Sequence, residues 1–145
     1  MIKPFQYYLN EKLVRRSLPN PSMAKSLLLK SEIRLKRISK ESIQEDESSI
    51  VFEEVYESIR ESLQSLMELK GFKPYSHEAI ISFIKEHSLL SLGRINIIDN
   101  YRVLRNNSIY QAEKVSIEKC KEALGFAKTT IPEIKKEFEG LLKKI

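Results

Sequence analysis

One predicted helix gathers side chains that could recognise a nucleotide or RNA. At about 100° per residue, five of its side chains fall within about 140° of one another: Arg102, Arg105, Asn106, Ile109 and Tyr110. A guanidinium group presents a planar fork of donors that matches phosphate, an asparagine amide can bond a base edge, and a tyrosine ring can stack on a base. The segment is therefore a candidate ligand site. The residue types alone somewhat favour the alternative of a buried polar network that orders helix packing.

Metal and cofactor chemistry has little support elsewhere in the chain. The borderline metal ligands are His77, His87 and Cys120, and they share no metal-ligand spacing. His77 falls in the first turn of a short predicted helix, a position more typical of a structural or exposed residue than of a catalytic one. The sequence therefore predicts no metal and no cofactor.

The net charge of +5 conceals three blocks of opposite sign. Residues 1–40 carry ten basic and two acidic side chains. Residues 41–70 carry two basic and nine acidic side chains, and residues 71–145 carry thirteen basic and nine acidic ones. An acidic block between basic ones predicts pairing within the chain or between subunits as readily as attraction to nucleic acid. The acidic block includes a ladder that is more typical of a solvated or ion-paired helix face than of a cation site: Glu53, Glu54, Glu57 and Glu61.

Apolar residues recur at helical spacing nearly throughout, which predicts an all-α protein. The expected helices cover residues 4–18, 21–40, 49–70, a short stretch after Ser76, residues 94–111, and a long stretch after Ser116. Residues 72–75 are predicted as a loop. Asn20, Ser76 and Ser116 are expected N-caps, Gly71 is an expected left-handed C-cap, and Pro132 is expected to kink or interrupt the last helix.

Length and composition predict one domain over residues 1–145, with an N-terminal helical extension at 1–20 and a core at about 22–138. Cys120 is the only cysteine, which excludes a disulfide framework within the chain. No apolar stretch approaches the ~18 residues of a membrane span, and the N-terminus lacks the pattern of a signal peptide. We therefore expect a cytoplasmic protein without a membrane partner.

Three parts of the chain, taken in order and spacing, carry a resemblance. They are Val55–Arg60 with Gly71–Ala79, then Asp99–Tyr110, then Val115–Glu118 leading into Ala123–Lys128. Over about residues 22–138 the chain resembles the HEPN superfamily. The resemblance implies an antiparallel up-and-down bundle of four or five helices, to which a short N-terminal helix is added here. It also implies a homodimer, with the Arg-Asn helices of both subunits facing one cleft.

The resemblance also bears on activity. Catalytic HEPN proteins are metal-independent ribonucleases whose motif is Arg, a polar residue, three variable residues and His. Arg105 and Asn106 match its first two positions, but Tyr110 stands where the motif has His. A phenol with an ordinary pKa near ~10 is a poor base at neutral pH. Family members with an Arg-Asn…Tyr pattern commonly pair with a small nucleotidyltransferase, as toxin–antitoxin-like partners.

Three hypotheses remain. In the first, a dimeric HEPN-like protein binds nucleotide or RNA and partners a nucleotidyltransferase; its binding residues are Arg102, Arg105, Asn106 and Tyr110. In the second, the protein is a metal-independent ribonuclease in which Arg105, Asn106 and Tyr110 are catalytic. In the third, it is a structural helical dimer without a ligand.

Overall fold

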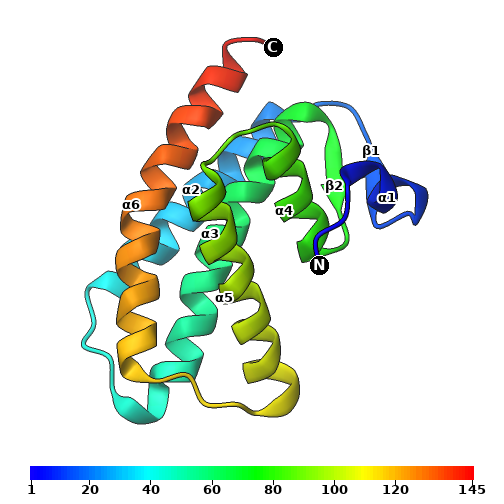
Figure 1. Ribbon diagram of the computed structural model, residues 1–145. Helices are drawn as coiled ribbons and strands as arrows, with labels where there is room; N and C mark the ends of the chain where they lie inside the picture. The colour runs from blue at the N-terminus through cyan, green and yellow to red at the C-terminus, as the bar shows by residue number, and fades with distance from the viewer.

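The computed structural model describes residues 1–145 as a helical bundle around one central helix, α3 (Ser48–Lys70). Four further helices contact it (Figure 1): α2 (Pro21–Ser39), α4 (His77–Glu86), α5 (Leu92–Gln111) and α6 (Ile117–Leu142). The long helices α2, α3, α5 and α6 alternate in direction along the chain, while α4 runs parallel to α3 (Figure 1). A single turn of 3₁₀ helix, η1 (Glu45–Glu47), leads into α3. The predicted all-α antiparallel bundle is confirmed.

The central position of α3 follows from its sequence. The predicted apolar stripe is buried, and Phe52, Val55 and Ile59 are completely inaccessible to solvent. Small serines lie buried between these apolar residues, and the hydroxyls of Ser58 and Ser62 donate to carbonyl oxygens three residues earlier. Because these small, internally satisfied side chains need little space, neighbouring helices can approach α3 on several sides.

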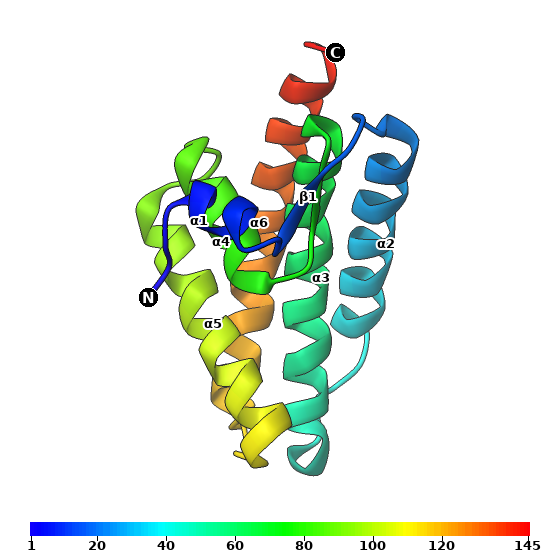
Figure 2. The ribbon, with the colours of Figure 1, turned by 90° about the vertical axis from the view of Figure 1, so that its right-hand side faces the viewer.

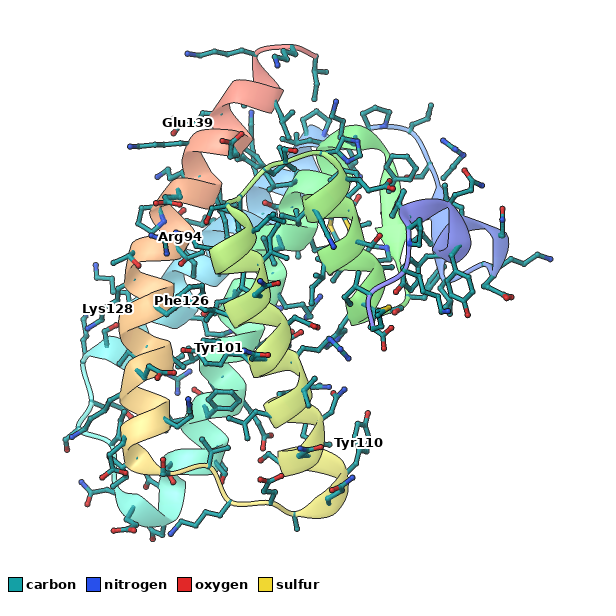
Figure 3. All side chains as sticks on the ribbon, in the orientation of Figure 1. Arg94, Tyr101, Tyr110, Phe126, Lys128 and Glu139 are labelled. Atoms are coloured by element: carbon teal, nitrogen blue, oxygen red, sulfur yellow. The ribbon has the colours of Figure 1, made fainter.

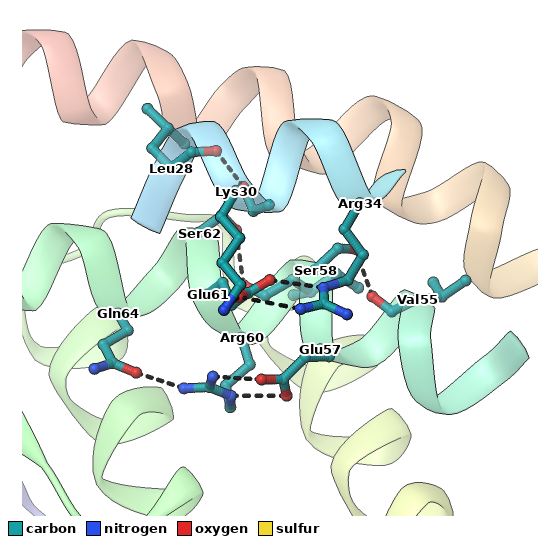
Figure 4. A network of polar contacts seen from close by, with 12 residues as sticks. Leu28, Lys30, Arg34, Val55, Glu57, Ser58, Arg60, Glu61, Ser62 and Gln64 are labelled. Carbon is teal, nitrogen blue, oxygen red and sulfur yellow. Dashed lines mark hydrogen bonds and ion pairs between the residues drawn. The ribbon is translucent and has the colours of Figure 1, made fainter. Parts of the chain in front are cut away.

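Two carboxylates on α3 are buried and paired. Glu61 is 1% exposed and accepts a hydrogen bond from Arg34 Nε of α2 at 2.9 Å. Lys30 Nζ lies 3.5 Å from the same carboxylate (Figure 4). Glu68, also 1% exposed, pairs with Lys73 Nζ at 3.1 Å. At Glu61, pairing within the chain links the basic N-terminal block to the acidic block.

Most helix ends form where the sequence predicts them. The side chains of Asn20, Ser76 and Ser116 each accept a hydrogen bond from a backbone N–H three residues later. Gly71 ends α3 with φ +79°, in the left-handed conformation predicted for it. Helix α6 continues from Ile117 to Leu142 with the exposed Pro132 inside it, so Pro132 does not interrupt the helix.

The prediction of one helix over residues 4–18 is wrong beyond Asn10. Helix α1 covers only Phe5–Asn10, and Val14–Arg16 form a strand, β1. This strand pairs antiparallel with β2 (Phe72–Pro74), so the predicted loop at 72–75 contains a strand as well. Lys12 adopts φ +59° and turns the chain out of the helix. The four-residue apolar spacing favours a helix locally, but pairing with a distant segment overrides it.

None of the helices has both the length and the apolar character that crossing a bilayer would require.

Candidate functional site

Three helices bring aromatic, imidazole and guanidinium groups together on one side of the bundle. Helix α3 contributes Tyr56 and Arg60, α4 contributes His77, and α5 contributes Arg102 and Arg105. Figure 2 looks onto the side where α4 lies between α3 and α5. We call Arg60, Arg102 and Arg105 the arginine cluster; all three lower the pKa of both Tyr56 and His77 through their positive charge.

Local structure fixes each of these positions. Tyr56 and Arg60 are four residues apart on α3 and therefore lie on one face of that helix. Ser76 caps α4 through Ala79 N–H, which places His77 at the first helical position beside α3. Arg102 and Arg105 are three residues apart on α5, on the side that faces α3 and α4.

Tyr56 and His77 form a directed pair. The Tyr56 hydroxyl lies 3.2 Å from His77 Nδ1, and the two rings are stacked with centroids 5.7 Å apart and an angle of 24° between them. Burial raises the pKa of Tyr56 well above its ordinary value, so the phenol keeps its proton. When the hydroxyl donates to Nδ1, the neutral His77 ring carries its own proton on Nε2.

His77 is neutral at physiological pH. Burial, the largest cause, and the positive charges of Arg105 and Arg60 together lower its pKa from 6.5 to about 4, while Glu57 acts in the opposite direction. A neutral imidazole with Nε2–H presents one hydrogen-bond donor without adding charge. In this state His77 can donate a hydrogen bond to an anion.

Arg102 is a structural member of the cluster. It is 8% exposed, and its Nε donates to Asp99 at 2.8 Å. Its Nη1 lies 3.4 Å from Glu78, and the Tyr8 hydroxyl of α1 donates to the same Glu78 carboxylate at 3.3 Å. Arg102 thus ties α5 to α4 and to the N-terminal segment. For this residue, the buried-network interpretation of the sequence matches the structure.

Arg60 is also committed to neighbours on its own helix. Its Nε donates to Glu57 at 2.9 Å, and further nitrogens bond Glu57 and Gln64 (Figure 4). The Arg60 guanidinium lowers the pKa of the Glu57 carboxyl, which keeps the pair ionised. A ligand would have to share this guanidinium with Glu57.

Arg105 differs from the other two arginines. It is half-buried, its Cζ lies 6.0 Å from the centroid of the Tyr56 ring, and its one hydrogen bond to a side chain runs to Asn106 Oδ1 at 3.2 Å. No carboxylate forms an ion pair with it, whereas Arg60 and Arg102 each have at least one such partner. Arg105 is therefore the cluster member whose charge is available to an anion.

The structure brings only part of the predicted site together. Arg105 and Asn106 are in contact, and Arg102 lies in the same cluster through its pairs with Asp99 and Glu78. Tyr110 is 76% exposed and projects outward near the end of α5 (Figure 3). Tyr110 is therefore accessible from solvent and forms no side-chain hydrogen bond with the residues of the cluster.

Sequence reasoning missed Tyr56 and Arg60 as site residues and treated His77 as structural or exposed. The apolar periodicity indicates only that Tyr56 is a core residue. Arg60 lies within the acidic ladder, where it is expected to pair with a carboxylate. One signal was available, because Val55–Arg60 and Gly71–Ala79 belong to the segments that carry the family resemblance. Their convergence on Arg105 depends on helix packing, which periodicity does not specify.

No protein-family model, curated protein or solved structure matches this chain. What the protein binds must therefore be inferred from the chemistry of the cluster itself.

Proposed function

We propose that this chain is a HEPN-like protein that binds the phosphate of a nucleotide or RNA at the arginine cluster. In this proposal Arg105 is the principal phosphate ligand. The Nε2–H of His77 supplies a second donor, and Asn106 holds the Arg105 guanidinium in place. Arg102 positions α5 through its ion pair with Glu78 of α4. The protein acts as a homodimer and as the toxin-like partner of a small nucleotidyltransferase.

The observation that carries the proposal is the free charge of Arg105. A half-buried guanidinium without a carboxylate partner is costly to keep in a protein, because the surroundings solvate it less well than water does. An anion would satisfy its donors through two parallel hydrogen bonds. The neighbouring Arg60 and Arg102 also act on Tyr56 and His77 with positive charge, although each is paired with a carboxylate.

Binding of ATP and of a short single-stranded RNA to wild type and Arg105→Lys tests this directly. The lysine variant keeps the charge but loses the planar fork, so we expect binding to weaken by about tenfold. Lys25→Ala on α2 is the matched control, because Lys25 is exposed and forms no ion pair. Equal binding by Arg105→Lys and wild type, combined with weaker binding by Lys25→Ala, would move the site to the basic α2 helix and refute the proposal.

Exposed apolar residues on α5 support the proposed dimer. Val103 is 45% exposed, Ile109 40% and Ile97 39%, although α5 also buries Ile95 and Ile98 in the core. At about 100° per residue these three side chains point about 120° apart, and Val103 is the one opposite the buried side of α5. A symmetric contact through α5 would cover Val103.

A second candidate, a metal-independent ribonuclease, is favoured by the position of His77. The motif helix lacks an imidazole because Tyr110 stands in the usual place, but α4 brings an imidazole into the field of Arg105. A bound phosphate would offset the arginines and raise the pKa of His77 toward the range where acid–base catalysis is effective. The test is RNA cleavage in EDTA. We expect none from wild type, and EDTA-resistant cleavage that His77→Ala abolishes would establish this candidate instead.

A further inference from the structure

The small two-stranded sheet has a free edge. In the pairing of β1 with β2, Tyr75 N–H donates to Leu13 O at 2.8 Å, and Ser17 N–H donates to Gly71 O at 2.7 Å. With Val14 opposite Pro74 and Arg16 opposite Phe72, these bonds make Arg15 and Lys73 the hydrogen-bonded pair. The backbone N–H and C=O groups of Val14 and Arg16 therefore point away from β2, and no other group of the chain bonds them.

A groove lies along this free edge. It has a volume of about 500 Å³ and runs between α1 and β1. Gln6, Leu9 and Asn10 of α1 and Val14, Arg15 and Arg16 of β1 line it, and Lys12 and Tyr75, the residue after β2, complete the lining. Figure 1 shows α1 beside the two strands at the edge of the molecule, and Figure 2 shows the same segments in front of the bundle. The groove therefore lies between a helix and a strand with unpaired backbone groups; Arg16 is exposed there, and Val14 is 4% exposed.

The groove is basic. Lys12, Arg15 and Arg16 line it, no carboxylate does, and none of the three forms an ion pair with the rest of the chain. The Arg16 guanidinium lies over the Phe72 ring at 5.3 Å from its centroid, which holds the charge beside the strand. Carboxylates of a bound molecule could therefore pair with basic side chains on β1 and just before it.

We infer that this groove binds an extended acidic peptide of a partner protein, which adds to β1 as a third strand. The backbone groups of Val14 and Arg16 would bond the peptide main chain, and Lys12, Arg15 and Arg16 would pair with its carboxylates. Addition of a strand to an exposed sheet edge is a recurrent mode of peptide recognition. The free edge favours a peptide over RNA, because a ladder of alternating N–H and C=O groups matches another peptide backbone. The site is separate from the arginine cluster and does not depend on its function.

Backbone amide shifts in ¹⁵N-labelled full-length protein can test the inference. The probe is a capped hexapeptide of alternating glutamate and valine. We expect its addition to shift the Val14 and Arg16 amides, which gain acceptors, more than the Arg15 amide, which is already bonded to β2. The same peptide N-methylated at every second residue keeps its charge but loses the donors on one edge, so it should bind at least about tenfold more weakly.

Charge is tested separately. Arg15→Glu should weaken binding of the glutamate peptide and leave β1 paired with β2, since the Arg15 side chain is exposed. Lys128→Glu on α6 is the control, with an equal charge change on an exposed site outside the groove. The inference is overturned if the peptide does not bind at millimolar concentration, if the N-methylated peptide binds equally well, or if a lysine–valine peptide does. It is also overturned if hexauridylate occupies the groove in preference to the peptide.

Discussion

At the scale of single residues, the environment of each side chain decides its role more than its type does. Arg102 and Arg105 are both arginines of one helix, yet Arg102 holds two carboxylates and Arg105 holds none. Their spacing predicts that both lie on one side of a helix. Their different roles could not be predicted from the sequence, because Glu78 reaches Arg102 from another helix.

His77 should make stability depend on pH. Its pKa is lowered from 6.5 to about 4 in the folded protein, so the unfolded chain binds more protons between these values. Its contribution to the free energy of unfolding is therefore complete above about pH 6.5 and is lost as the pH falls toward 4. Because the ring is partly exposed, we expect a loss of only about 1–2 kcal/mol. Urea unfolding at several pH values would measure it, and His77→Gln should flatten the curve in this range.

Tyr110 should matter little for stability. Its side chain is 76% exposed, so Tyr110→Phe and Tyr110→His should change the free energy of unfolding by less than about 0.5 kcal/mol. If Tyr110 is a target for nucleotide transfer by a partner enzyme, Tyr110→Phe should abolish labelling by that enzyme. Gain of RNA cleavage in Tyr110→His would instead favour a degenerate ribonuclease. Thermal unfolding, labelling and cleavage assays on the same variants distinguish these outcomes.

At the scale of elements, the long helices follow from local sequence and the short strands do not. Asn20, Ser76, Ser116 and Gly71 each act at a helix end as predicted. The three-residue strands β1 and β2 have no alternation long enough to be detected, and each forms only because the other is present. Sequence patterns therefore predict self-sufficient elements and miss those that depend on a distant partner.

The buried carboxylate of Glu61 should be a major contributor to the contact between α2 and α3. Glu61→Ala would leave Arg34 without its partner, and we expect a loss of about 3 kcal/mol in the free energy of unfolding. Glu54→Ala on the same helix is the control, because Glu54 is exposed and unpaired, and it should cost less than about 0.5 kcal/mol. Equal denaturation midpoints for the two variants would contradict this view of Glu61.

At the scale of the whole molecule, the proposed homodimer predicts a measurable mass in solution. Light scattering should give about twice the chain mass of 16.9 kDa at micromolar concentration. Val103→Glu should shift the protein toward monomer, because it replaces an exposed apolar side chain of α5 with a charged one. Leu29→Glu is the control, since Leu29 is equally apolar and 58% exposed, but lies on α2. A wild-type monomer would exclude the dimer.

The pairing of β1 with β2 also makes a closed ring of the chain between them. Residues 17–71, which include α2 and α3, are enclosed by contacts between strands far apart in sequence. Closing so long a segment costs entropy before the contacts are gained, so the ring should close late during folding. Helices α2 and α3 are neighbours in sequence and can associate first. Pulsed hydrogen exchange during refolding should therefore protect the amides of α3 before those of Arg15 and Lys73.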